Sequence, residues 1–126
     1  MAVAGCVYAL FHGYFDHGHF ELKQSQRSPP NRVAMLAERW DEQSLGGLQD
    51  FVVIGDHTYS PAELRHALYS DAVIFSALSD CIKLRWDGPK KLIIRCEGST
   101  IDTRHINRQK HQVGDISVSY ENIASK

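Results

Sequence analysis

A short stretch near the N-terminus concentrates residue types that bind metal ions. Three histidines, an aspartate and a glutamate fall within ten residues, at His12, Asp16, His17, His19 and Glu21. Imidazole and carboxylate groups are ligands that suit zinc, iron and manganese. Residues two apart in a strand share a face, so His17 and His19 would begin a ligand set that Glu21 extends. One hypothesis is therefore a metal-binding protein or small metal-dependent enzyme that uses His12, His17, His19 and Glu21.

The chain around these histidines also predicts a β-hairpin, which weakens the metal hypothesis. Residues 3–15 and 19–24 have the pattern of strands, and the loop 16–18 ends in a glycine that suits a left-handed conformation. His12 and His19 would then point to opposite faces, and their spacing matches no common metal motif. A hairpin with polar histidines and aromatic cross-strand pairs is the preferred interpretation, and no cofactor is expected.

Charges are sorted along the chain, although the formal net charge is only −1. Residues 36–80 contain eight acidic residues, opposed only by Arg39 and Arg65, whereas lysine and arginine predominate in residues 81–113. Such a distribution is typical of a surface that contacts nucleic acid or phosphate. It also suits copies of one protein that associate acidic surface on basic surface.

The basic residues gather around a segment that predicts a second β-hairpin. Apolar and basic residues alternate from Ile82 to Trp86, a turn sequence follows at 87–89, and residues 91–96 return as the second strand. The alternation places Trp86 on the core side and the cations towards solvent. We expect this surface to bind through charge, without stacking of bases on aromatic rings. It consists of Lys83, Arg85, Lys90, Lys91, Arg95, Arg104 and Arg108.

Motifs for nucleophilic catalysis and for phosphate-binding loops are missing from the sequence. Gly-x-Ser-x-Gly does not occur, and no cysteine has a histidine within a few residues. Asp56 could orient the imidazole of His57 beside Ser60, but Ser60 is better explained as a helix cap. Gly46-Gly47 lacks the lysine and hydroxyl residue of a phosphate loop. The sequence therefore favours a protein that is not an enzyme.

Cysteine usage and hydropathy bear on the compartment. Cys6, Cys81 and Cys96 form no Cys-x-x-Cys pair. Cys81 and Cys96 could meet across the second hairpin, but free buried thiols in a reducing compartment are the preferred interpretation. Apolar runs fall short of the roughly 20 residues that span a bilayer, and residues 1–10 lack the basic residues of a signal peptide. We expect a cytoplasmic protein without membrane contact.

The remaining periodicity predicts helices that cover one face of a sheet. Residues 31–43 have apolar side chains at helical spacing, and Ser60-Pro61-Ala62-Glu63 combines an N-cap with a capping box. Whether the helix from Pro61 continues, or a new helix covers residues 71–79, stays open. Residues 51–54 and 115–120 have the pattern of strands, and 98–112 that of a loop-rich segment.

These elements predict a single α+β domain over residues 1–126. Two hairpins and one or two further strands would form a mostly antiparallel sheet, with two or three helices packed on one face. The segment VGDISVSY, residues 113–120, resembles a segment near the C-terminus of some bacteriophage head–tail adaptor proteins, a similarity over eight residues that implies no site residues.

The preferred function is a non-enzymatic interaction or assembly protein. Its basic hairpin would contact nucleic acid, phosphate or an acidic protein surface, or another copy in a homo-oligomer. The alternative is the metal-dependent protein built on the histidine-rich N-terminal segment.

Overall fold

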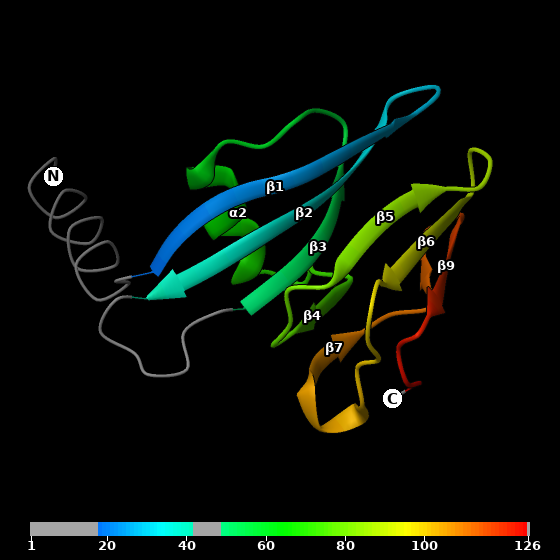
Figure 1. Ribbon diagram of the computed structural model, residues 1–126. Helices are drawn as coiled ribbons and strands as arrows, with labels where there is room; N and C mark the ends of the chain where they lie inside the picture. The colour runs from blue at the N-terminus through cyan, green and yellow to red at the C-terminus, as the bar shows by residue number, and fades with distance from the viewer. Residues whose placement is uncertain (1–17, 42–48, 126) are drawn as a thin grey trace, which may run out of the picture.

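The computed structural model describes residues 18–41 and 49–125, which fold into two packed β-sheets with one α-helix outside them (Figure 1). The five-stranded sheet has the order β1-β2-β3-β4-β7, and the four-stranded sheet has the order β5-β6-β9-β8. The strands are β1 (Gly18–Ser28), β2 (Arg32–Asp41), β3 (Gln49–Gly55), β4 (Phe75–Ala77), β5 (Ile82–Trp86), β6 (Lys91–Cys96), β7 (Ile106–Gln109), β8 (Gln112–Val113) and β9 (Ile116–Glu121). Helix α2 spans Pro61–Leu68, and a 3-10 turn spans Thr103–His105.

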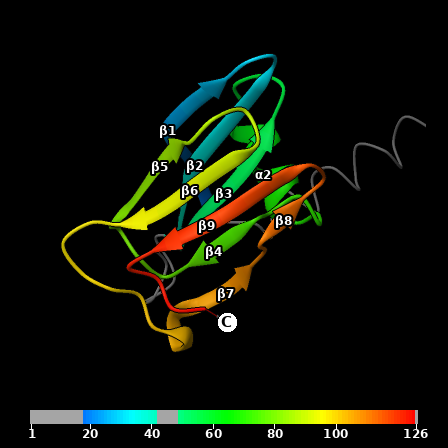
Figure 2. The same ribbon diagram turned by 90° about the vertical axis from the view of Figure 1, so that its right-hand side faces the viewer.

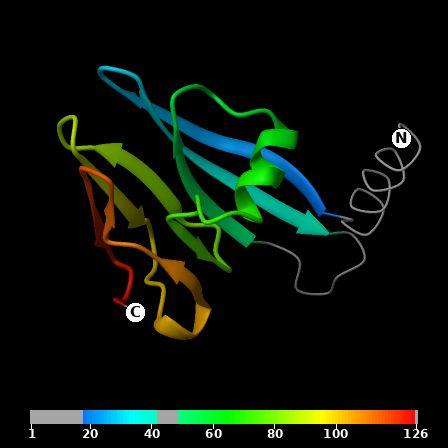
Figure 3. The same ribbon diagram turned by 180° about the vertical axis from the view of Figure 1, so that it is seen from behind.

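The expected α+β domain with two or three helices on one sheet is wrong. The described residues contain two sheets and a single α-helix, and most of them lie in strands. The neighbouring strands pair antiparallel except β6 and β9, which run parallel side by side (Figure 2). Helix α2 covers the outer face of β1, β2 and β3 (Figure 3). The described part of the chain therefore has three layers, a helix and two sheets.

Strand β2 occupies the segment that was expected to be a helix. Val33, Met35 and Ala37 pack in the core under α2, whereas Ala34 and Leu36 pack in the core between the sheets. All five are buried, because the strand lies in the middle layer and both of its faces are covered. The sequence of such a strand is continuously apolar and does not alternate between apolar and polar residues. A continuous apolar run also contains apolar residues at helical spacing, which explains why a helix was predicted here.

The first described strand is longer than expected. β1 continues past residue 24, where the predicted strand ended, and pairs with β2 from Gly18↔Asp41 to Ser28↔Arg32. The turn between them contains a cis peptide bond at Pro29-Pro30. Residues 3–15, expected as the other strand of an N-terminal hairpin, lie outside the described residues.

Helix α2 begins as the capping residues predicted. Ser60 Oγ accepts a hydrogen bond from the Glu63 amide, and the Glu63 carboxylate accepts one from the Ser60 amide. The helix ends at Leu68, and no second helix covers residues 71–79. Residues 73–77 are instead buried, and β4 pairs between β3 and β7. Pairing with β3 and β7 decides that this segment forms a strand and not a helix. The local sequence leaves both open, since Ser70 and Asp71 suit a turn as well as a helix cap.

The basic hairpin forms as predicted. β5 and β6 pair antiparallel, and Trp86 packs against the core between the sheets. β9 confirms the expected final strand, while β7 lies in the stretch expected to be loop-rich. Cys81 and Cys96 form a disulfide bond at the base of the hairpin, so the expectation of free thiols at these two positions is wrong.

The outer edge of β5 is covered by β1. The Leu84 amide donates to Oε1 of Gln24 at 2.7 Å, and the Trp86 indole donates to the carbonyl of Gln26 at 2.8 Å. These bonds join the two sheets along one side and satisfy groups that an edge strand would otherwise expose. No helix among the described residues is long and apolar enough to cross a membrane.

Candidate functional site

The predicted basic surface begins on the outer face of the four-stranded sheet. Lys83 and Arg85 on β5 and Arg95 on β6 are exposed, because they alternate with residues that face the core between the sheets. Lys83 lies directly opposite Arg95 in the antiparallel register. Two like charges therefore stand side by side, which by itself destabilises a sheet, while Glu121 on β9 is the register partner of Arg95 on its other side.

Ion pairs divide the predicted basic residues into two groups. Three of them already have a carboxylate partner, in the pairs Arg104–Asp102 at 2.8 Å, Arg108–Asp71 at 3.2 Å and Lys91–Asp87 at 3.9 Å. Hydrogen bonds from Arg104 also lower the pKa of Asp102 to about 2. The other four have no described carboxylate within 4.0 Å and are called here the unpaired cations: Lys83, Arg85, Lys90 and Arg95.

The tip of the basic hairpin is held by the rest of the protein. Arg32 donates to the carbonyl of Pro89 at 2.8 Å and pairs with Asp115 at 2.6 Å. The Ser117 amide donates to the carbonyl of Lys90 at 2.8 Å. Because these bonds fix the backbone, the hairpin presents its cations without an ordering step.

A polar depression of about 270 Å³ adjoins the unpaired cations. It is bordered by Lys83, Arg85 and Arg95, by the amides Gln24 and Gln26, and by Glu97 and Glu121. Both carboxylates lie towards the base of the hairpin, since Glu121 on β9 lies beside Arg95 in the strand register. The surface is therefore most positive towards the tip. The sequence contained no signal that β1 would add Gln24 and Gln26, because that contact depends on the packing of the two sheets.

Most of the acidic side chains described in the middle of the chain have a basic partner in the same molecule. Lys23 reaches both Glu38 and Asp50, and Arg108 and Lys110 both reach Asp71. His57 lies between Asp56 and Glu63. Among the acidic side chains described between residues 36 and 80, only Asp80 lacks such a pair. Acidic-on-basic contact between copies would therefore draw on carboxylates that mostly have a partner already, while the groups around Lys23 and His57 keep an excess of negative charge.

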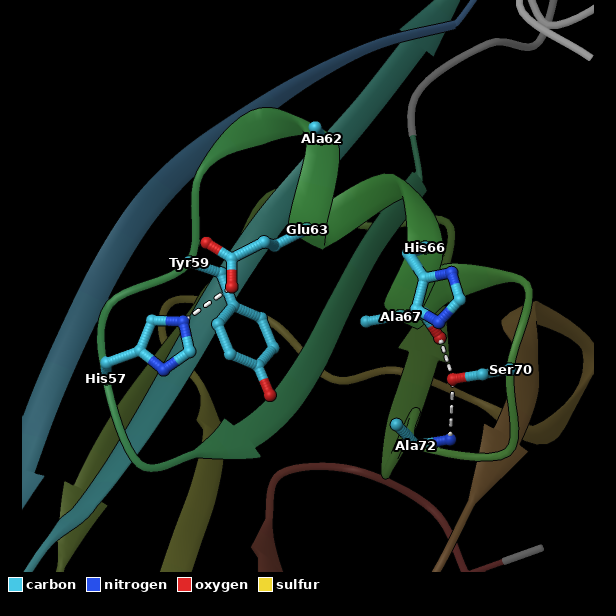
Figure 4. A pocket seen from close by; sticks show the side chains of 8 residues that line it. All are labelled: His57, Tyr59, Ala62, Glu63, His66, Ala67, Ser70 and Ala72. Atoms are coloured by element: carbon cyan, nitrogen blue, oxygen red, sulfur yellow. Dashed lines mark hydrogen bonds and ion pairs between the residues drawn. The ribbon is translucent and has the colours of Figure 1, made fainter. Parts of the chain in front are cut away.

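A larger cavity, of about 510 Å³, lies on the other side of the sandwich, against α2 (Figure 4). Its lining consists of His57, Tyr59, Ala62, Glu63, His66, Ala67, Ser70 and Ala72. The sequence singled out none of these as a group. Residues of the loop before α2, the helix itself and the segment after it meet only in the folded chain.

His57 bridges two carboxylates at the rim of this cavity. Its Nδ1 lies 2.6 Å from Asp56 Oδ1, and its Nε2 lies 2.5 Å from Glu63 Oε2. Hydrogen bonds to Glu63 and Asp56 raise the pKa of His57. Both ring nitrogens are occupied, and the Ser60 hydroxyl caps the helix. The site therefore does not have the geometry of a general base beside a nucleophile.

The structure describes only half of the predicted metal ligands. His12 and His17 lie outside the described residues, while His19 stacks on Trp40 with ring centroids 4.3 Å apart. Glu21 is exposed on β1. In the described part of the chain, no group of three or more His, Cys, Asp or Glu side chains could hold a metal ion.

Comparison with family models, curated proteins and solved structures found no match to this chain. The arrangement of its own side chains therefore carries the functional interpretation.

Proposed function

We propose that this protein is a non-enzymatic binding module whose four-stranded sheet engages the phosphate backbone of a nucleic acid. The observation that carries the proposal is a set of four cations on one hairpin with no described carboxylate within 4.0 Å, Lys83, Arg85, Lys90 and Arg95. A bound phosphate would relieve the repulsion between Lys83 and Arg95, which face each other across β5 and β6. The unpaired cations thus gain most from an anionic partner.

The chemistry of this face favours contact with backbone phosphates over recognition of bases. Trp86, the aromatic side chain of the hairpin, packs towards the core, and its indole nitrogen already donates to Gln26. Lysine and arginine that contact phosphates position a protein but carry no sequence information. The proposed binding is therefore insensitive to sequence and sensitive to salt.

A salt titration of binding to an oligonucleotide tests the proposal. Fluorescence anisotropy with single- and double-stranded DNA of about 20 nucleotides would give the slope of log K against log salt, expected near −0.9 for each phosphate neutralised. Replacing Lys83 and Arg95 by alanine should make that slope shallower by about 2. The matched control is Arg104→Ala with Arg108→Ala, which removes two cations that are already paired and should leave the slope nearly unchanged.

Two outcomes would count against the proposal. Absence of binding at low salt would overturn it outright. Equal effects of the two double variants would show that total charge, and not the unpaired cations, drives binding. A polyglutamate peptide in the same assay separates the partner classes, since tighter binding to it than to DNA would assign the surface to an acidic protein. Sedimentation velocity of the free protein tests the expected homo-oligomer.

A further inference from the structure

We propose that the cavity beside α2 is a second site, separate from the basic surface, that binds a small uncharged molecule with a planar ring. The cavity and the unpaired cations lie on opposite outer faces of the sandwich, so the two sites do not share residues. Its volume of about 510 Å³ is within the range of sites for small molecules.

One wall of the cavity is an aromatic ring whose position depends on a glycine. A Cβ atom on Gly55 would lie 2.7 Å from ring atoms of Tyr59, closer than real contacts allow. The Tyr59 amide also donates to the sulfur of Met35 at 3.2 Å. The ring therefore stands in a place that only glycine at position 55 leaves open, with the His57 ring beside it at 4.9 Å between centroids. An aromatic ring in the wall is a favourable contact for a second planar ring.

The opposite wall is held by hydrogen bonds around Ser70. The Ser70 hydroxyl donates to the carbonyl of Ala67 at 2.9 Å and accepts from the Ala72 amide at 3.2 Å. Figure 4 shows Tyr59 on one side of the space and His66 with Ser70 on the other. The Ser70 side of this wall is thus held without a ligand.

Two polar side chains of the lining have bonding capacity to spare. The Tyr59 hydroxyl and the His66 ring have no hydrogen-bond partner among the described residues, whereas His57, Glu63 and Ser70 are each engaged. A hydroxyl and an imidazole can each donate and accept. A carbonyl, amide or hydroxyl on the edge of a ring therefore finds complementary groups here.

The charge of the rim disfavours an anionic ligand. Asp56 and Glu63 share one histidine, so these three groups carry a net negative charge even when His57 is protonated. No lysine or arginine lines the cavity, and its apolar lining includes Ala62, Ala67 and Ala72. Both oxygens of Glu63, the carboxylate in the lining, are already engaged, Oε1 by the Ser60 amide and Oε2 by His57, so an ammonium group gains little from them. An uncharged ring with one polar edge fits best.

Three probes of similar size and different charge test this assignment. Benzamide, benzoate and benzylamine would each be titrated into the isotope-labelled protein and followed by amide chemical shifts. Benzamide should bind in the millimolar range, as expected for so small a molecule, with shifts centred on Tyr59, His66 and Ala72. Tighter binding of benzoate or benzylamine than of benzamide would overturn the assignment of an uncharged ligand. Absence of saturable shifts with all three would overturn the site.

Variants locate the binding. Ala62→Phe, at an exposed helix position, should fill the cavity and abolish benzamide shifts, and Tyr59→Phe should weaken binding about fivefold by removing one hydrogen bond. Tyr69→Phe is the matched control, because it removes a hydroxyl from an exposed tyrosine outside the lining. Unchanged affinity in Ala62→Phe would show that the probe binds elsewhere. Each variant should keep the wild-type slope of log K against log salt in DNA binding, which shows that the two sheets are still folded.

Discussion

The ammonium group of Lys23 on β1 lies 3.2 Å from Oδ1 of Asp50 on β3, and Asp50 is completely buried. Lys23 also lies 3.2 Å from Glu38 on β2. Burial raises the pKa of Asp50 to about 6 although Lys23 lowers it, and the charges of Glu38 and Asp80 raise it further. One cation thus compensates acidic groups from neighbouring strands.

Removing Lys23 should destabilise the protein in a pH-dependent manner. Lys23→Met leaves Asp50 buried without its cation, and we expect a loss of about 3–5 kcal/mol in the free energy of unfolding at neutral pH. The folded-state pKa of Asp50 lies above its unfolded value, so the ionised carboxylate lowers the free energy of unfolding. This destabilisation disappears as pH falls through about 6 towards 3.8, because Asp50 is then protonated in the folded protein. The loss should therefore shrink on acidification, as measured by urea unfolding at about pH 8 and about pH 5.

The matched variant carries Asp50→Asn together with Lys23→Met. It removes the buried charge along with its partner, so it should recover most of the lost stability at neutral pH. A double variant as unstable as Lys23→Met alone would show that the packing of the lysine stem, and not the charge of Asp50, dominates.

The bridge formed by His57 should stabilise the loop before α2 only while the imidazole is charged. The pKa of His57 is raised by Glu63 and Asp56, so its contribution is fully present below the unfolded value of 6.5 and is lost as pH rises through the folded value. Melting temperatures from pH 5 to pH 9 should show this loss in the wild type and not in His57→Gln. A titration midpoint of His57 at or below 6.5 by NMR would contradict the bridge.

Gln24 should contribute more stability than Gln26, although both lie on β1 beside β5. The Gln24 side chain accepts from the Leu84 amide, so Gln24→Ala leaves a backbone donor unsatisfied and should cost about 1–3 kcal/mol. Gln26 uses only its backbone carbonyl towards Trp86, so Gln26→Ala keeps that bond and should be nearly neutral. Equal losses in chemical denaturation would contradict the side-chain contact.

The disulfide should stabilise the hairpin that carries the unpaired cations. Cys81 and Cys96 are 15 residues apart, and closing a loop of that length contributes about 3 kcal/mol by restricting the unfolded chain. Dithiothreitol should lower the unfolding midpoint of the wild type and leave that of Cys81→Ala with Cys96→Ala unchanged. Cys6→Ser should respond to the reductant as the wild type does; an unaffected wild type would mean that the bond does not form.

Local signals predicted the elements whose information lies within a few residues. The capping box at Ser60 and Glu63 set the start of α2 correctly, and the alternation around Lys83 set the faces of the basic hairpin. The same kind of reasoning failed for β2, because a strand covered on both faces has no alternation to detect. The predicted basic residues Arg104 and Arg108 could not be separated from the others, since their partners depend on the folded chain.

By itself the sequence determined the capped helix, the second hairpin and the inward position of Trp86, because neighbouring residues and their period decide these features. Only the tertiary structure decided that Lys83, Arg85, Lys90 and Arg95 stay unpaired while most acidic side chains described between residues 36 and 80 have a basic partner within the molecule. The cavity between Tyr59 and His66 is likewise a product of packing. Charge pairing and cavity shape depend on distances between residues far apart in the chain, and folding alone sets those distances.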